Sequence, residues 1–382
     1  MAVQLVNPLP SIHPVLDPLI VSLADPSEPA SGREGQSQCE VQIEVEDSLD
    51  SGTWRLIGEI LNPYDYTTDT AKAVLHKTLQ GALSYFLPNL TVSGSQAMPG
   101  PVKRYRLKAR DVVDGIPEGS LVATDPGRAW LAGQSYTAQG TDLTSGKAYL
   151  FLTTRSLTRR LHPSEKIHLQ VLQLATGTPT VRIKALFTDG TDQTDTVGLS
   201  AGTAYIPFAV NITLPTYTKT AHTIEIDLTG LSGTAEKLTY QLISRPAPYF
   251  RQLFYANSLG GLDHLALTGK CEEITTPSGE IFEAQEYPHA PPSGGAGGGG
   301  NSRAFNQRST DSLILRTGYM SEAEKRSLRD LTLRNEAWIL DGLAFRKIIL
   351  SNTQWTVKAD DQYLHALELT ARYAWDEIAY SR

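Results

Sequence analysis

Cysteine is scarce in this chain, and its scarcity excludes the frameworks that cysteine usually builds. Only Cys39 and Cys271 occur among 382 residues, and neither belongs to a Cys-x-x-Cys pair. Neither a disulfide framework nor a zinc site is therefore indicated. We expect two free, partly buried thiols in a protein made in a reducing cytoplasm.

Long apolar runs are also missing. The first residues, Met1–Pro8, lack a basic segment followed by a continuous apolar one, and no apolar run reaches the roughly 20 residues that a membrane helix needs. The sequence therefore predicts a protein that is synthesised and folds in the cytosol, without a membrane span.

Positive charge is in deficit, with 34 Lys and Arg residues against 41 Asp and Glu residues and a formal net charge of -7. A protein that grips nucleic acid needs a concentrated positive surface to neutralise phosphates. The one dense basic run, Lys103–Arg110, alternates as the solvated face of a strand does. We expect a structural or subunit-contact role for this run and no nucleic-acid partner, because one strand offers few phosphate contacts.

Catalytic sequence patterns are absent too. None of the eight histidines forms a His-Glu-x-x-His motif, and His162 and His168 form only a weak cluster with Glu165. No Gly-x-Ser-x-Gly elbow marks a serine nucleophile. The glycine stretch 291–300 lacks the Lys-Ser/Thr that closes a phosphate-binding loop, which argues against nucleotide binding.

The carboxylate groupings favour structure over chemistry. Glu272-Glu273 and Asp360-Asp361 are adjacent, so on a strand their side chains point to opposite faces and do not share acid-base work. Thr188–Asp195 offers three carboxylates, but it departs from the EF-hand spacing, and we favour a solvated hairpin tip over a calcium site. We predict a protein that is not an enzyme and has no catalytic, cofactor-binding or metal-binding residues.

Proline dominates the beginning of the chain. Residues 1–38 are rich in Pro, Ser and Gly, and six prolines exclude a long helix. We predict an extended N-terminal arm over 1–38. Two roles stay open for it: docking on a neighbouring subunit, or a partly ordered lead-in to the first strand.

Alternation of polar and apolar residues is the strongest pattern that is present. Glu40–Glu46 alternates strictly, Trp54–Ile60 follows after a turn, and Lys103–Ala109 supplies a further strand. Between them, a helix capped by Asp69 or Thr70 is predicted to run to Pro88. Residues 39–118 are therefore predicted to form a small β domain with a crossover helix.

From 119 to 245 the pattern is uniformly β, and we predict a central antiparallel β-sandwich. The predicted strands are Ala148–Thr153, Ile167–Leu174, Thr180–Phe187, Ala204–Ile212, Thr223–Leu228 and Leu238–Ile243.

Residues 246–382 are predicted to form a C-terminal β domain. Its features are a hairpin over Phe254–Gly269, a glycine-rich loop over 291–302 and a short helix opened by the capping box Ser321–Glu324. We expect the loop to become ordered against an adjacent subunit. Three tryptophans are interpreted as core anchors rather than sugar platforms: Trp338, Trp355 and Trp375. The fold class is thus mainly β, with multidomain antiparallel β-sandwiches and one or two short helices.

The hairpin segment Phe254–Gly269 also carries a family resemblance, together with other segments in the same order and spacing. These are Leu313–Tyr319, the closing strands Phe345–Leu350 and His365–Trp375 and, more weakly, Arg128–Gly133 and Tyr149–Thr153. The set resembles tail structural proteins, of the minor tail, tail-tip or baseplate type, of phages and prophages that infect Bacteroidota.

The resemblance implies a virion structural protein that is assembled in the bacterial host cytoplasm and located in the tail. Its partners would be further copies of itself, in a ring of three-fold or six-fold symmetry, and other tail or baseplate proteins. The alternative is a carbohydrate- or receptor-binding β-sandwich module that contacts a host surface glycan, suggested by the central sandwich and the sixteen tyrosines. A hydrolase is disfavoured because no acid-base or nucleophile constellation is present.

Overall fold

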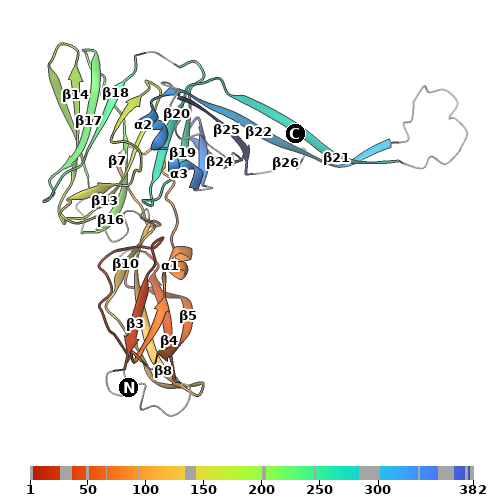
Figure 1. The fold of residues 1–382 in the computed structure, drawn as a ribbon. Coiled ribbons are helices and arrows are strands. Elements are labelled where there is room, and N and C mark those ends of the chain that lie inside the picture. Colours follow the sequence, from red (N-terminus) through yellow and green to blue (C-terminus); the bar gives the residue numbers. More distant parts are fainter. Residues whose placement is uncertain are drawn as a thin grey trace, which may run out of the picture. The chain divides into compact units, whose positions relative to one another are not determined.

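Strands dominate the computed structural model of the protein (Figure 1). The structure describes residues 3–25, 37–48, 51–65, 67–92, 94–133, 143–199, 204–244, 247–283, 302–333, 336–351, 365–374 and 377–378. Of these described residues, 57% lie in strands and 5% in helices. The predicted fold class, mainly β and multidomain, is confirmed.

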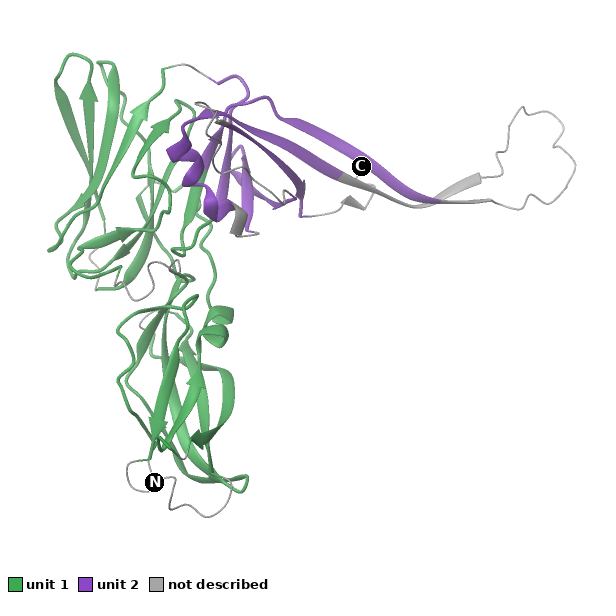
Figure 2. Cartoon of the chain, in the orientation of Figure 1, with its two compact units in different colours: residues 1–246, 256–264 green, residues 247–255, 265–382 purple. Residues whose placement is uncertain are grey.

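The chain divides into two compact units (Figure 2). Unit 1 comprises residues 1–246 and 256–264, and unit 2 comprises residues 247–255 and 265–382. Unit 1 holds the first sheet and a pair of central sheets, whereas unit 2 holds the C-terminal sheet and two helices.

The first sheet of unit 1 has, among the described residues, the strand order β1-β3-β6-β5-β4-β8-β10-β2, with β9 paired to β8. The bounds are β1 (Gln4–Leu5), β2 (His13–Pro14), β3 (Ile20–Ala24), β4 (Ser37–Glu46), β5 (Trp54–Asp65), β6 (Thr70–Val74), β8 (Val102–Val113), β9 (Ile116–Ala123) and β10 (Gly127–Trp130). The alternation at Glu40–Glu46 places Val41, Ile43 and Val45 in the core, as predicted.

The segment predicted to be an extended arm differs from this expectation. Val15 and Leu23 are fully buried, and strand β3 lies between β1 and β6 in the sheet. The physical reason is that Pro18 and Pro26 flank Ile20–Ala24 without interrupting it, so its alternating apolar residues can pair with β6. The first β domain therefore begins within residues 3–25.

The helix predicted between Thr70 and Pro88 is shorter than expected. Thr70–Val74 is strand β6, paired with both β3 and β5, and helix α1 covers only His76–Ala82. Within β6, Ala71 and Ala73 are buried in alternation, and pairing on both edges makes this segment a strand, so the helix begins only after it. Leu79 is the buried residue of the short helix.

The boundary predicted at residue 118 also lies elsewhere. Strands β9 and β10 complete the first sheet, and β7 (Gly94–Ala97) joins a central sheet by pairing with β16 (Ile206–Ile212). The chain therefore crosses between the first and central sheets more than once. A cluster that includes Met98, Trp130 and Leu172 fills the space where these crossings occur.

Two central sheets follow in unit 1, and all six strands predicted between residues 119 and 245 are confirmed. Among the described residues, one sheet has the order β11-β13-β16-β7 and the other β12-β18-β17-β14-β15. The remaining bounds are β11 (Tyr149–Phe151), β12 (Thr158–Leu161), β13 (Ile167–Gln173), β14 (Thr180–Phe187), β15 (Asp192–Gly198), β17 (Ala221–Thr229) and β18 (Lys237–Leu242). Both sheets contribute to one core, which includes Val171, Ile183 and Tyr240.

Unit 2 has, among its described residues, a sheet of order β20-β19-β23-β24-β25-β22-β21, with β26 paired to β22. The bounds are β19 (Arg251–Ala256), β20 (Leu262–Leu267), β21 (Glu272–Glu283), β22 (Ser302–Met320), α2 (Glu322–Arg326), α3 (Arg329–Leu333), β23 (Ala337–Asp341), β24 (Ala344–Leu350), β25 (His365–Tyr373) and β26 (Glu377–Ile378). Leu328 and Leu331 pack into the core of this sheet.

Several C-terminal predictions can be checked directly. The hairpin at Phe254–Gly269 is confirmed as β19 and β20, and the capping box is confirmed by reciprocal hydrogen bonds between Ser321 and Glu324. Trp338 is buried, as expected of a core anchor. Trp355, Trp375, Asp360-Asp361 and the glycine-rich loop up to residue 301 lie outside the described residues.

Candidate functional site

The candidate site is a ribbon of two strands in unit 2. Strand β21 pairs with β22 from Glu272↔Ile314 to Glu283↔Ser302. Residues 302–311 of β22, the part beyond Ser312, do not pair with β25; among the described residues they pair with β21 and, at 308–309, with β26. At about 3.3 Å per residue, the part beyond Ser312 is about 30 Å long. Figure 2 shows the ribbon continuing past the rest of its sheet.

The ribbon lacks a core of its own in the part that the structure describes. Every residue from Glu272 to Glu280 is exposed, including the apolar Ile274. The outer edge of β21 has no partner strand among the described residues. An isolated two-stranded hairpin is at best marginally stable in water, and a long open edge is a template for pairing. A ribbon of this kind is therefore a surface suited to docking.

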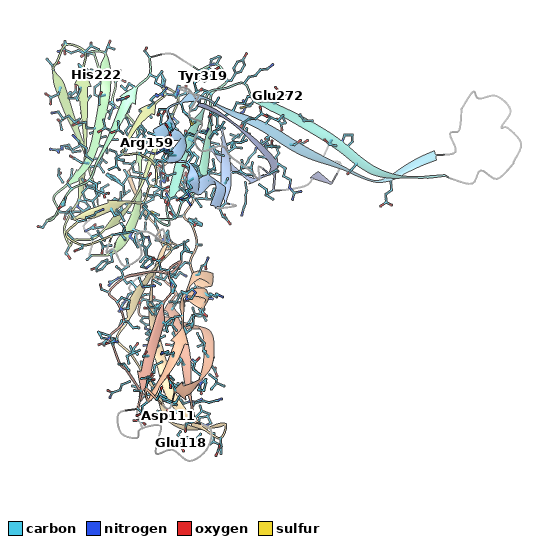
Figure 3. The ribbon with its side chains drawn as sticks, viewed as in Figure 1. Asp111, Glu118, Arg159, His222, Glu272 and Tyr319 are labelled. Atoms are coloured by element: carbon cyan, nitrogen blue, oxygen red, sulfur yellow. The ribbon has the colours of Figure 1, made fainter. Side chains whose placement is uncertain are left out.

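The base of the ribbon is fixed by Arg316, which links three strands. Its guanidinium donates to Glu272 at 2.9 Å, to Glu368 at 2.8 Å and to the carbonyl of Lys270 at 3.0 Å. The hydrogen bond from Arg316 holds the pKa of Glu272 below its usual value. Figure 3 labels Glu272, where the ribbon begins. The network sets the direction in which the ribbon leaves the sheet.

The basic run Lys103–Arg110 lies on β8 of unit 1, and four of its five cations pair with carboxylates of β4. The register places Arg110 opposite Glu40 and Arg106 opposite Glu44 on β4. Both pairs have N–O distances of 2.7 Å, and Lys108 contacts Glu44 at the same distance. Because Arg106 and Lys108 share Glu44 and Arg110 pairs with Glu40, these ion pairs offset part of the positive charge of the run and join β8 to β4. The expectation of a structural or subunit-contact role without a nucleic-acid partner stays a prediction.

The turn between β19 and β20, which belongs to unit 1, is held by buried hydrogen bonds. The Asn257 side chain donates to the carbonyl of Leu152 at 2.8 Å and accepts from the amides of Leu259 and Gly261. Gly260 has a φ of +79°, and a Cβ on Gly261 would lie 2.2 Å from the Leu152 carbonyl oxygen. Only glycine permits this approach. Close packing and the hydrogen bonds of Asn257 therefore fix the shape of this turn.

Strand β20, which follows this turn, contains the buried carboxylate of Asp263. Asp263 accepts hydrogen bonds from Thr153, from the amide and hydroxyl of Thr154 and from Asn257, and its carboxylate lies 4.0 Å from the guanidinium of Arg159. Both charged side chains are almost fully buried. Arg159 lies on β12 and is labelled in Figure 3. A buried charge with this many partners fixes the hairpin tip to the central sheets.

His264 completes the cluster by donating from Nδ1 to Glu165 at 2.9 Å. Burial opposes the charge on Glu165, yet the hydrogen bond from His264 and the nearby Arg155 hold its pKa below the usual value. Burial lowers the pKa of His264, so the imidazole is neutral at pH 7. The sequence places Glu165 near His162 and His168, but its side-chain partner comes from a strand 99 residues away.

The cavity beside this cluster is about 10 Å³, enough for at most one water molecule. An Asp, a His and a Glu together can suggest acid-base catalysis. Here the space for a substrate is missing, and the groups are engaged with one another. The cluster therefore serves to hold the fold together.

His168 is also buried, and its ring bridges two amides. Nδ1 lies 2.8 Å from the Asn211 oxygen, and Nε2 lies 3.1 Å from the Gln170 amide nitrogen, which is the pattern of a neutral imidazole. Burial lowers the pKa of His168 to about 4. In the unfolded chain the pKa is about 6.5.

This difference predicts a pH-dependent stability. Between pH 6.5 and 4 the unfolded chain binds a proton that the folded chain does not, so the His168 contribution is complete above pH 6.5 and is lost as the pH falls to 4. The full loss is about 3 kcal/mol. We expect His168→Gln to reduce the fall in the midpoint of unfolding across this pH range. His222 is exposed and labelled in Figure 3, and His222→Gln should leave the pH profile of the midpoint unchanged. Equal profiles for all three proteins would contradict this account.

The cysteines and the carboxylates of Thr188–Asp195 are the other residues considered as candidate sites in the sequence. Cys39 is buried and Cys271 partly buried, and the two thiols do not form a disulfide bond. Thr188–Asp195 lies at the β14–β15 hairpin, where Asp189 pairs with Lys219 at 2.8 Å, as a solvated tip would. Within the described ranges, no group of three or more metal-ligating side chains is found, and no helix is long and apolar enough to cross a membrane.

Comparisons with known proteins give no family. No family model and no characterised sequence matches the chain. Among solved structures, it is similar to dimeric latent PorU from Porphyromonas gingivalis, at 8% identity and a TM-score of 0.22 over 82% of this chain and 32% of PorU. It is also similar to CBD12 from CALX1.2, at 8% identity and a TM-score of 0.19 over 61% of this chain and 82% of CBD12. The chain thus spans about a third of PorU, and TM-scores this low carry no argument about function.

Proposed function

We propose that this chain is a structural component of a phage tail or tail-like particle, positioned near the tail tip or baseplate, and that it acts by homo-oligomeric assembly. The observation that carries the proposal is the ribbon of β21 and β22, whose exposed length and open edge lack a partner within the described chain. The sequence resemblance to tail structural proteins points in the same direction.

The rest of the described chain is consistent with a scaffold. The buried cluster around Asp263 has no space for a substrate, and the positive charge of the basic run on β8 is partly offset by carboxylates of β4. Two rigid β units with one projecting ribbon can make the same contact repeatedly. When the contact joins unlike surfaces, identical copies close into a ring if the rotation allows it.

A ring of three or six copies, with further tail or baseplate proteins as neighbours, is the arrangement we propose. The ribbon would reach a neighbouring copy and either lie in a groove or add its open edge to a sheet there. The gain in buried area would supply the stability that the ribbon lacks alone.

Sedimentation of native lysate from the producing bacterium tests this function. We expect the protein to co-sediment with tailed particles in a density gradient, and electron microscopy with a labelled antibody to place it at one end of the tail. Recovery of the protein solely as a small species, in lysates that contain tailed particles, would overturn the proposal.

A further inference from the structure

A second feature of unit 2 is a pocket of about 500 Å³. It is formed where the first residues of β19 and β21 approach the turn between β23 and β24, all within unit 2. Its volume falls in the range of small-molecule sites, which is roughly 300–1,000 Å³. The pocket is fifty times larger than the cavity beside Asp263.

The lining of the pocket combines aromatic and apolar side chains. Leu313, Leu315 and Ile339 are buried residues of the lining. Tyr249 also lines the pocket and is 52% exposed, although an aromatic ring of this size is usually covered in a folded protein. Tyr373 lines the pocket beneath the guanidinium of Arg346, 5.9 Å from its ring centre.

The charged groups in the lining are engaged with neighbours. Asp341 pairs with Arg346 at 2.7 Å, and Glu272 pairs with Arg316 at 2.9 Å. Glu273 hydrogen-bonds to the hydroxyl of Tyr373. A cation would have to compete with these partners, and three carboxylates against two lining guanidinium groups disfavour a phosphate or other anion.

We infer that this pocket binds a neutral saccharide. A sugar ring has apolar C–H faces, which stack on aromatic rings, and hydroxyl groups, which accept from guanidinium and donate to carboxylate without needing a free charge. The tyrosines of the lining offer rings for the C–H faces, and its ion-paired polar side chains offer partners for the hydroxyl groups. This inference stands apart from assembly, because it concerns a pocket that lies outside the ribbon beyond Ser312.

The test uses the full-length protein on an array of neutral oligosaccharides of glucose, galactose, mannose and N-acetylglucosamine, followed by calorimetric titration with the best binder. We expect Tyr249→Ala to weaken binding at least tenfold. Tyr319→Ala is the matched control, because Tyr319 is 73% exposed in the same unit but does not line the pocket. It should bind as the unchanged protein does.

Three results would overturn the inference: no neutral oligosaccharide bound at millimolar concentration, binding confined to sulfated or phosphorylated sugars, or equal binding by Tyr249→Ala. If circular dichroism shows that Tyr249→Ala is misfolded, Tyr249→Leu keeps a larger apolar side chain than alanine and still removes the stacking ring, and the same tenfold loss is expected. Oligomer formation is measured separately, so loss of one property does not imply loss of the other.

Discussion

Shortening the ribbon should abolish assembly and leave the monomer folded. Replacing residues 279–307 with Asn-Gly joins Ser278 to Arg308, which are register partners, and preserves the pairing of β22 with β26. Asn-Gly is suited to a tight hairpin turn. Because the removed part adds no described core contact, we expect the melting temperature to change by less than about 2 °C. We expect light scattering to report only monomer.

A second variant distinguishes the contribution of residues 284–301 to assembly from that of the two strands. Asn-Gly in place of residues 284–301 closes the register pair Glu283↔Ser302 and keeps the full ribbon. Assembly by this variant, with loss of assembly in the shorter one, would assign the contact to the strands. If the shorter variant forms the same oligomer as the unchanged protein, the ribbon is not the assembly surface.

Removing the buried carboxylate should cost more stability than any other single change considered. Asp263→Ala leaves the Arg159 guanidinium buried without its ion pair and deprives Thr154 and Asn257 of an acceptor. Breaking a buried pair in this way typically costs about 3–5 kcal/mol. For a unit of this size we expect a fall in melting temperature of roughly 6–20 °C, measured by differential scanning calorimetry.

Two further variants make that result specific. Asp263→Asn keeps hydrogen-bond acceptance and loses the charge, so its melting temperature should lie between those of Asp263→Ala and the unchanged protein. Asp189→Ala removes an exposed carboxylate from a hairpin tip and should leave the melting temperature unchanged. An equally small effect from Asp263→Ala and Asp189→Ala would show that the cluster does not hold the hairpin tip.

The strands of this protein were largely predictable because their signal is local. Alternation at Thr180–Phe187 follows from one buried face, and alternation at Glu40–Glu46 follows from an apolar face in the core opposite a face of buried, ion-paired glutamates. The capping box at Ser321 follows from four adjacent residues. Local patterns do not predict the secondary structure of segments in which pairing with a distant strand determines it. Thr70–Val74 directly precedes apolar residues at helical spacing, but it pairs with a strand on each edge. Ile20–Ala24 lies in a proline-rich segment, but it pairs with β6.

The functional features depend on long-range contacts that no local pattern contains. Asp263 and His264 stand beside a glycine turn in sequence, but Thr153, Arg159 and Glu165 reach them from about 100 residues away. The signal that was present is the pair of glycines at 260 and 261, since such a turn implies close backbone approach. The ribbon and the pocket arise from sheet order, which local spacing does not specify.

The most direct test of the central claim is photo-crosslinking from the ribbon during particle production. A photoreactive amino acid replaces Glu280, which is exposed on β21, and the covalent products are identified by mass spectrometry. The account predicts products that join this position to a second copy of the chain or to another tail protein. Particles that form normally while position 280 yields no intermolecular product would contradict it.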